Sequence, residues 1–397
     1  MSGLAQALVA AAPAALRDLT LPGARDERWR YSSLRALNAR AFMPAPTVAG
    51  RLSDASLDYV ETLSPRLVFV DGQYDGARSA LGALAAAVML GESAAPRDVP
   101  PHSTLARAAA AAASTFVVRI GASTSVPIHI VSVITDAAQD AIVQQSLRVE
   151  LAEGVTAAIV HHRMGAGDSN TFVNLWRDLL LADGARLHWL ETAIEGGGAS
   201  VVLGTRAVIA TSARFEFAEV AAGAALYRHE LDTTLDGEQA ELIMRGCAMA
   251  GQRRHADLHI DVRHRARNTR SDIVWRGLAD QRGHAIFAGQ LIVEAGADGA
   301  DAALSNKNLL LSAHAEINTR PVLEIHADEV KAAHGATVGR LDERSLFYLR
   351  SRGIAEPEAR RILQLAFARE PLLQLSDATV REAALAALAR CLPEDAA

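Results

Sequence analysis

Two patterns of hydrophobic positions alternate along the chain and divide it into three parts. In residues 1–113, alanine, leucine and arginine dominate, and apolar positions recur every three or four residues in 4–19 and 81–90. This spacing predicts a mainly helical N-terminal domain. Residues 94–102 hold three prolines, which can continue neither a helix nor a central strand, so we expect a linker there.

From Thr115 onward, apolar and polar positions alternate with a period of two, which predicts strands. Small turns then recur between alternating arms at Gly154, Gly184, Ser212 and Gly237, at separations of 30, 28 and 25 residues. Repetition on this scale is typical of stacked units that bury their faces against their neighbours. We therefore predict a β-solenoid over residues 114–338, with an antiparallel sandwich as the alternative.

After Gly339 the pattern returns to helix and predicts a C-terminal helical domain over residues 339–397. Asp342 is placed to cap the first helix, and Gly353 follows its expected end. Pro357 suits the first turn of the next helix. A third helix, capped by Ser376 or Asp377, carries an apolar stripe that makes its cysteine a core thiol. The stripe comprises Val380, Ala384, Leu388 and Cys391.

Composition narrows the classes of function. The chain has 40 basic and 46 acidic residues, a net charge of −6 that argues against a general nucleic-acid binder. Cys247 and Cys391 lie too far apart for a disulfide framework or a local metal motif, which fits the reducing cytoplasm. The first 21 residues lack the basic start of a signal peptide, and no run resembles a membrane span. We expect a cytoplasmic protein without membrane or nucleic-acid partners.

The two lysines exclude one large class of enzymes. A P-loop needs a lysine directly after glycine and before serine or threonine, but Lys307 follows Asn306 and Lys331 follows Val330. No serine-hydrolase elbow, zinc-protease helix or dinucleotide fingerprint is present either. The chain is therefore not expected to hydrolyse ATP by itself.

A histidine group in the strand region invites a metal hypothesis. His255 and His259 fall on one face of a predicted strand, and His264 follows five residues later. Eight arginines between Arg253 and Arg282 oppose a bound cation, although they could contact phosphate. A solvated or partner-facing strand surface is the favoured interpretation.

The segment 305–352 holds both lysines and several linked motifs. It includes Asn-Lys-Asn-Leu-Leu from Asn306, Pro-Val-Leu-Glu-Ile from Pro321, Asp-Glu-Val-Lys from Asp328, His-Gly-Ala-Thr from His334 and Phe-Tyr-Leu-Arg-Ser-Arg-Gly from Phe347. In this order they closely resemble the B and D subunits of Suf-type iron–sulfur cluster assembly scaffolds. The D type is favoured, because Glu27-Arg-Trp-Arg-Tyr31 resembles its N-terminal element and cysteine is scarce.

The resemblance implies a mainly β fold, a right-handed parallel β-helix flanked by N- and C-terminal helical domains. It also implies a non-catalytic scaffold that pairs with a SufB-type paralogue through the β-helices. The C-terminal helices would hold a SufC-type ABC ATPase, and a desulfurase system would supply sulfur indirectly. A homodimer is an open alternative in isolation, because the edges of a β-helix can pair.

The same resemblance assigns residues to the site. His334 would be a ligand to a transient iron–sulfur cluster shared with the partner, with no cofactor held by the chain alone. Ala332 stands where many members have cysteine, so the chain itself brings no cysteine to that position. The period-two spacing of Glu324, His326 and Asp328, apart from the resemblance, predicts one row on a strand face beside it, either of ligands and hydrogen-bonding groups or of a solvated edge. The interface would be completed by Lys307, Glu324, Asp328, Lys331, Phe347 and Tyr348.

A function from another class is a β-helix hydrolase or lyase acting on polysaccharide. Such an enzyme usually needs paired or calcium-binding carboxylates along a groove with aromatic platforms. Aromatic residues make up only 5% of this chain, which disfavours that alternative.

Overall fold

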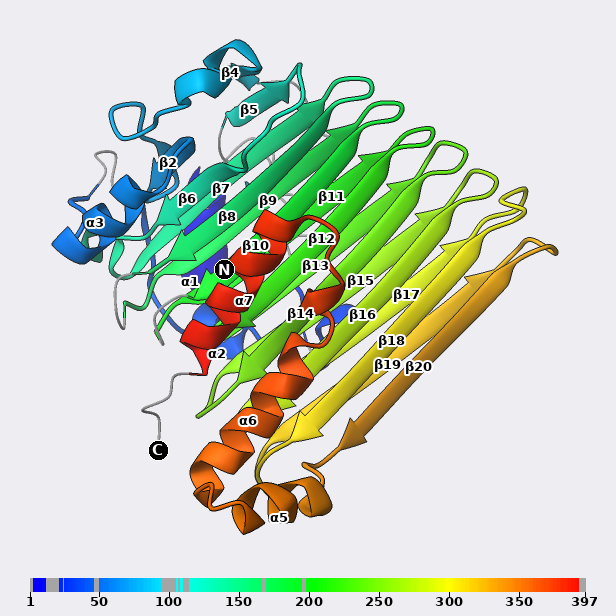
Figure 1. The fold of residues 1–397 in the computed structure, drawn as a ribbon. Coiled ribbons are helices and arrows are strands. Elements are labelled where there is room, and N and C mark those ends of the chain that lie inside the picture. The colour runs from blue at the N-terminus through cyan, green and yellow to red at the C-terminus, as the bar shows by residue number, and fades with distance from the viewer. Residues whose placement is uncertain are drawn as a thin grey trace.

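A computed structural model describes residues 3–11, 21–23, 25–45, 50–93, 105, 108–109, 114–165, 169–194 and 198–392. Two long sheets face each other, and each consists of ten strands (Figure 1). Strands with odd numbers form one sheet and strands with even numbers form the other, except that β4 ends the odd sheet beside β5 and β3 ends the even sheet beside β2; the short β1 joins the odd sheet at β7. The chain therefore passes from sheet to sheet at almost every turn.

The strands of the odd sheet, in spatial order, are β4 (Val88–Ser93), β5 (Thr115–Ile120), β7 (Ala141–Leu151), β9 (Phe172–Leu181), β11 (Ser200–Ile209), β13 (Leu226–Leu235), β15 (His255–His264), β17 (His284–Val293) and β19 (Glu316–Ile325), with β1 (Met43–Pro44) beside β7. Those of the even sheet are β3 (Gln73–Tyr74), β2 (Arg66–Val70), β6 (Ile128–Val133), β8 (Thr156–Met164), β10 (Arg186–Ile194), β12 (Arg214–Ala222), β14 (Glu241–Ala250), β16 (Arg270–Ala279), β18 (Asp301–Leu310) and β20 (Lys331–Gly339).

The predicted β-solenoid is confirmed. From β5 and β6 to β19 and β20, each strand pairs in parallel with the strand one coil further on. The sandwich alternative is wrong, because that fold would pair its strands antiparallel. Alternation along each strand sends one set of side chains into the space between the sheets, where a single apolar core runs along the solenoid.

The predicted turns are the corners of this solenoid. The chain turns between β7 and β8 at Gly154 and between β9 and β10 at Gly184, both with positive φ. The amide of Gly154 donates to the carbonyl of Asp183 at 2.9 Å, and that of Gly184 donates to Thr211 at 2.8 Å. The corners stack through these backbone hydrogen bonds, so a turn signal recurs once per coil.

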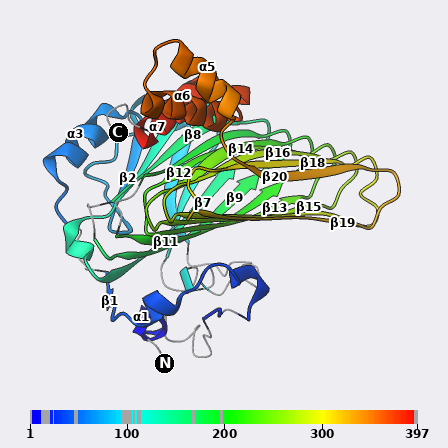
Figure 2. The same ribbon diagram turned by 90° about the horizontal axis from the view of Figure 1, so that it is seen from below.

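Helices cover the two outer faces. The C-terminal helices α6 (Glu356–Arg369) and α7 (Ala378–Cys391) pack on the even sheet, whereas α5 (Glu343–Ser351) stands beside the ends of the last strands (Figure 1). Helices α1 (Gly3–Ala11) and α2 (Arg35–Asn38) lie on the side of the odd sheet (Figure 2). Helix α3 (Asp54–Thr62) contributes Val60 to an apolar cluster with β2 and β6.

The predicted ends of the C-terminal helices are confirmed. The side chain of Asp342 accepts a hydrogen bond from the Ser345 amide at 2.9 Å, and Gly353 has a φ of +87° just beyond α5. Pro357 lies in the first turn of α6. Asp377 caps α7 by accepting from the Val380 amide at 2.9 Å. The stripe that begins at Val380 is buried against the sheet.

The N-terminal part contains more strand than the spacing of its apolar residues predicted. The helix expected over 81–90 is wrong: a short 3-10 helix, Gly82–Ala86, leads into β4, which pairs antiparallel with β5. Sheet pairing therefore overrides the helix propensity of alanine and leucine. The proposed linker at 94–102 lies outside the described residues, so the domain boundaries stay a prediction.

Gly246 on β14 tests the packing between neighbouring coils. A Cβ at this position would lie 2.2 Å from the Trp275 ring and 2.7 Å from the Glu219 carbonyl oxygen. Because overpacking a filled core costs about 1–3 kcal/mol, Gly246→Ala should lower the free energy of unfolding by that amount. Urea denaturation followed by circular dichroism measures this change. At Gly251 nothing lies within 4 Å of an added Cβ, so Gly251→Ala is the matched control and should stay near the wild-type midpoint.

Candidate functional site

The last coil of the solenoid differs from all earlier ones because nothing in the described structure covers it. Strands β19 and β20 end the odd and the even sheet, so each has one edge without a neighbouring strand. Residues along β20 are exposed or half-buried, whereas those of the central strands are mostly buried. In Figure 1 these two strands form the orange edge of the molecule. An unpaired strand edge offers backbone donors and acceptors to a partner.

His334 lies on β20 at this open end. It stands in register with Leu304 of β18, whose side chain belongs to the core. Because residues in register share a face, the His334 imidazole is on the inner side of the coil. It is nevertheless exposed, since no further coil covers it.

The Asn-Lys-Asn motif holds the open coil together beside His334. Asn306 and Asn308 point inward from β18 and are buried. Asn308 Nδ2 donates to Asn306 Oδ1 at 2.6 Å and to the Thr337 carbonyl on β20 at 3.1 Å. Thr319 on β19 donates its hydroxyl to Asn306 Oδ1 at 2.7 Å. Amide side chains thus connect three strands at the coil where apolar cover is missing.

The other predicted interface residues divide into two groups at opposite ends of β20. Lys331 is in register with Asp301, and Lys307 is in register with Thr337 six positions further along. At about 3.3 Å per residue these positions are about 20 Å apart. Glu324 and Asp328 lie around the β19–β20 turn with Lys331, whereas Phe347 and Tyr348 lie on α5 beyond the other end of β20.

The predicted row of Glu324, His326 and Asp328 on one strand face is wrong, because β19 ends at Ile325. The turn still brings His326 Nε2 to 2.9 Å from Glu324 Oε1, and this hydrogen bond holds the pKa of Glu324 below its usual value. Asp328 is exposed in the turn.

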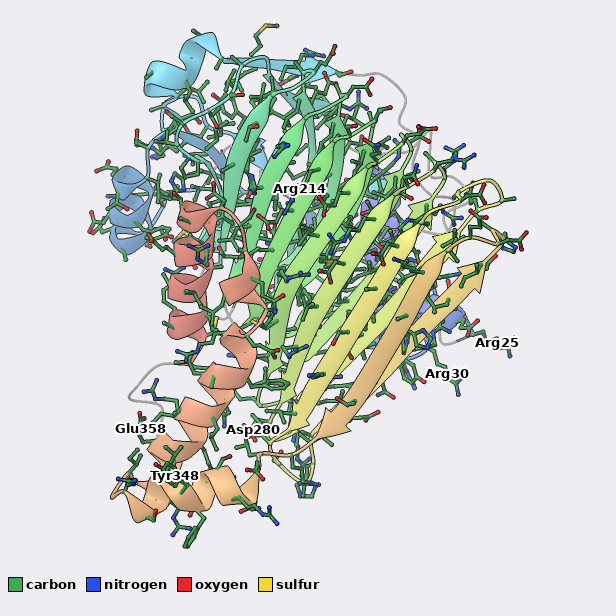
Figure 3. The ribbon with its side chains drawn as sticks, turned by 45° about the vertical axis from the view of Figure 1, so that its right-hand side comes forward. Arg25, Arg30, Arg214, Asp280, Tyr348 and Glu358 are labelled. Atoms are coloured by element: carbon green, nitrogen blue, oxygen red, sulfur yellow. The ribbon has the colours of Figure 1, made fainter. Side chains whose placement is uncertain are left out.

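Helix α5 presents two aromatic side chains to solvent. Phe347 is 73% exposed and Tyr348 is 57% exposed, although Leu346 between α5 and its neighbours is buried. Figure 3 shows Tyr348 projecting from the end of the C-terminal helices, away from the sheets. Large exposed aromatics are more typical of an interaction surface than of a solvated helix.

The three histidines of β15 do not converge on a metal. His255 and His259 share the outer face, as predicted, but His264 points inward to the hydroxyls of Thr269 and Ser271, at 2.9 and 2.8 Å. Among the described residues, no group of three or more histidine, cysteine or acidic side chains is arranged to hold a metal ion.

The outer face of β15 is instead covered by the N-terminal Glu27–Tyr31 element, which sequence reasoning did not place. Arg28 Nη1 lies 2.5 Å from Asp261 Oδ2, and Arg228 stacks 3.8 Å above the Trp29 ring. Ser32 hydrogen-bonds to both His255 and Asp257. This is no hydrolase triad, because Ser32 is buried and Asp257 binds the serine rather than the second ring nitrogen of the histidine.

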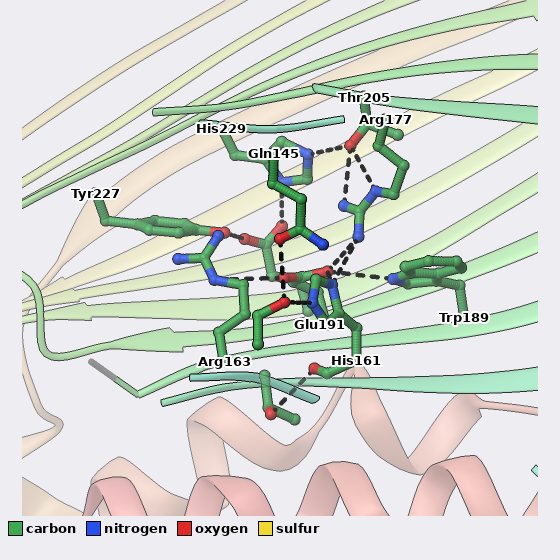
Figure 4. Close-up of polar contacts among 12 residues, drawn as sticks. Gln145, His161, Arg163, Arg177, Trp189, Glu191, Thr205, Tyr227 and His229 are labelled. Carbon is green, nitrogen blue, oxygen red and sulfur yellow. Dashed lines mark hydrogen bonds and ion pairs between the residues drawn. The ribbon is translucent and has the colours of Figure 1, made fainter. Parts of the chain in front are cut away.

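A buried ionic network between the sheets was also missed. Glu191 is fully buried and lies 2.5 Å from Arg177 Nη1 and 3.1 Å from His161 Nδ1 (Figure 4). Burial alone would raise the pKa of Glu191, but the positive Arg177 and the His161 hydrogen bond hold it well below its usual value. One coil further on, Glu219 lies 2.9 Å from His229 Nδ1. The charged residues within the predicted strands indicated that such a network could exist, but the sequence did not show which of them would be in contact.

Both cysteines are unsuited to bind metal in this conformation. Cys247 is buried in the apolar cluster between the even sheet and the C-terminal helices, and Cys391 packs against the same cluster. Burial raises the pKa of Cys391 to about 12 and that of Cys247 further. The thiolate is the form that ligates metals, so neither sulfur is available as it stands.

Fold and site together define a class: a parallel β-solenoid whose last coil is uncovered and carries an accessible histidine. A family model described as the SufBD core domain of the SUF system for iron–sulfur cluster assembly matches residues 133–367, more than half of the chain. The chain therefore belongs to the SufBD family of iron–sulfur cluster assembly scaffold proteins.

Individual relatives agree with this family. The chain is 30% identical to the iron–sulfur cluster assembly protein SufD of Escherichia coli over 384 residues, which span 94% of this chain and 90% of that protein. It is 28% identical to a SufBD family protein of Synechocystis, with 92% and 86% covered, and 26% identical to one of Mycobacterium leprae, with 93% and 90% covered. The polysaccharide-enzyme alternative has no counterpart among these relatives. Within the described residues, no helix has the length and apolar character needed to cross a membrane.

The inward-pointing His264 predicts a loss of stability in mild acid. Burial lowers its pKa to about 4, whereas the unfolded chain takes up the proton near 6.5. Stability is thus fully present above pH 6.5 and falls as the pH drops from 6.5 towards 4, by about 2 kcal/mol between pH 7 and pH 5 for this one group. His264→Gln should remove that part of the pH dependence in urea denaturation at the two pH values. The exposed His314→Gln is the control and should keep the wild-type difference; an unchanged difference in His264→Gln would contradict the prediction.

Proposed function

We propose that the chain is the D-type scaffold subunit of a cytoplasmic Suf iron–sulfur cluster assembly complex. The observation that carries this proposal is the exposed His334 on the inner face of an uncovered coil. An imidazole in that position can reach an iron that the chain alone cannot enclose. The family membership and the likeness to the Escherichia coli SufD protein support the same function.

The partner at the open coil would be a SufB-type paralogue. The unpaired edges of β19 and β20 can add strands from a second solenoid through backbone hydrogen bonds. Val338 on β20 and Ile325 at the end of β19 are 44% and 43% exposed, which supplies apolar area. Charged Glu324, Asp328 and Lys331 around the turn would form a polar rim. A second copy of this chain is the alternative occupant of the same edges.

The C-terminal helices would hold a SufC-type ABC ATPase. The absence of a P-loop means that any ATP-driven step needs another chain. Phe347 and Tyr348 on α5 are the exposed aromatics available for that contact, and aromatic anchors often dominate binding energy. We place Lys307 near this end of β20, where it would contribute at the periphery.

The iron–sulfur cluster would be cargo, held transiently at the interface rather than as a resident cofactor. His334 would supply one ligand in its neutral form, because a protonated imidazole has no lone pair for iron. Ala332, the buried Cys247 and the half-buried Cys391 leave sulfur ligation to the partner. A desulfurase system would supply the sulfur indirectly. The chain would then position a ligand without catalysing a reaction by itself.

Replacing His334 tests the ligand role. In a mixture of this chain, a SufB-type paralogue, the ATPase and a sulfur source, His334→Ala should lower the yield of assembled cluster about tenfold or more, measured by visible absorbance. His326→Ala is the matched control, because that histidine is also exposed near the open coil but lies in the turn. Co-purification with the paralogue should be unchanged in both variants. Normal cluster assembly by His334→Ala would rule out its role as a ligand.

Two further variants separate the two docking surfaces. Val338→Lys puts a charge on the open coil and should weaken binding of the paralogue, whereas Phe347→Ala should weaken binding of the ATPase only. Loss of a central anchor typically costs about 2 kcal/mol, or about thirtyfold in affinity. Pull-down of each partner, combined with the mass of each complex in solution, measures both effects. Equal losses for both partners, or none, would contradict this assignment, and a homodimer that Val338→Lys dissociates would favour the second copy as occupant.

A further inference from the structure

Arginines gather at one corner of the solenoid. Two turns stack there: residues 251–254 between β14 and β15, and residues 280–283 between β16 and β17. The Arg282 amide donates to the Gln252 carbonyl at 2.8 Å, so the turns lie one above the other. Together with Ala225 they line an open space of about 640 Å³ that we call the arginine hollow. Its lining comprises Ala225, Gln252, Arg253, Arg254, Gln281 and Arg282.

The three arginines of the arginine hollow form no ion pair with an acidic side chain in the described structure. Within the described part of the chain, Arg253, Arg254 and Arg282 have no carboxylate within the 4 Å of an ion pair. Three like charges along two adjacent turns repel one another unless an anion lies between them. Such an arrangement costs stability in the free protein and is therefore suited to a ligand.

The opposite corner shows that unpaired arginines are not a general property of these turns. There Arg265 lies 2.8 Å from Asp236, and Arg267 lies 4.0 Å from Asp298. Both corners belong to the same coils, and the arginines of both are exposed except Arg254, which is half-buried. The difference lies in the pairing: acids form ion pairs with the arginines of one corner, whereas Asp280, the acid of the other corner, forms none with the three arginines there.

One polar atom of an arginine that lines the hollow lacks a hydrogen-bond partner. Arg254 Nε is covered from solvent and has no hydrogen-bond acceptor among the described residues. A buried donor without an acceptor costs about 1–3 kcal/mol. Asp280, the acid of these two turns, does not fill this need, because its Oδ1 accepts from the Gln281 amide at 2.7 Å. Figure 3 shows Asp280 at the lower ends of the strands.

We propose that the arginine hollow binds a small, multiply charged phosphate compound of the diphosphate class. Guanidinium groups present paired N–H donors that match phosphate oxygens, and three of them suit more than one phosphate group. The side-chain amides of Gln252 and Gln281 add uncharged donors. Its volume is in the range of small-ligand sites, and its lining has no aromatic side chain to stack on a base, which disfavours nucleic acid.

Titration calorimetry of the full chain with inorganic diphosphate, at constant ionic strength, tests this site. Arg254→Gln and Arg282→Gln should each weaken binding about tenfold, because a hydrogen bond to a charged group contributes on that scale. Arg265→Gln removes one charge at the opposite corner and is the matched control, with wild-type affinity expected. Thermal unfolding without ligand verifies that each variant folds. The proposal would be overturned if all three variants bound diphosphate with equal affinity. It would also be overturned if the wild-type chain responded to chloride as it does to diphosphate.

A charge change of opposite sign gives an independent check. Asp280→Asn keeps an oxygen for the Gln281 amide but removes the negative charge beside the hollow, so diphosphate should bind several-fold more tightly. Weaker or unchanged binding by this variant would overturn the site. Titration with ADP distinguishes the source of the phosphates. If the chain binds ADP more tightly than diphosphate, the ligand is a nucleotide; if it binds both equally, the ligand is inorganic diphosphate. Either result supports the phosphate site.

Discussion

Every coil of this solenoid depends on the next one to cover it. Parallel strands in register extend from β5 and β6 to β19 and β20, and each coil satisfies its backbone groups and hides its interior only through its neighbours. The solenoid therefore ends in a coil with two free edges, one on β19 and one on β20. At that end Asn306, Asn308 and Thr319 replace the apolar contacts of earlier coils with hydrogen bonds between side chains. The same constraint that builds the core also leaves His334 accessible.

The stacking of coils also explains how charged side chains are accommodated between the two sheets. Register aligns residues of successive strands, so Glu191 and Glu219 lie side by side on neighbouring strands. Each needs its own cation or donor, because an unpaired buried carboxylate costs several kcal/mol. Arg177 and His161 contact the carboxylate of Glu191, and His229 contacts that of Glu219. Such paired charges fix which coil lies beside which, since a shift of one strand would separate every pair.

The sequence predicted the repeating parts of the fold better than its exceptions. The turns at Gly154 and Gly184 were predictable because glycine readily adopts a positive φ. The cap at Asp342 was predictable because it involves only one side chain and the amide three residues later. The strand at 88–93 was missed because its pairing with β5 outweighs a local preference for helix. The contact between Arg28 and Asp261 joins residues 233 positions apart, and no local pattern encodes that distance. Motif resemblance singled out His334, but its exposure depends on where the stacking stops.

The distribution of imidazole and thiol groups has one further consequence. Histidines inside the solenoid or beneath the N-terminal element have partners, as His264 and His255 show, whereas the histidine of the last coil faces open space. Neither thiol is open in this way: Cys247 is buried on the even sheet beneath the C-terminal helices, Cys391 is half-buried on α7 against the same cluster, and burial raises the pKa of both. A soft metal centre needs thiolate or sulfide, which this surface does not offer. An accessible nitrogen donor combined with inaccessible sulfur therefore suits half of a shared site better than a complete one.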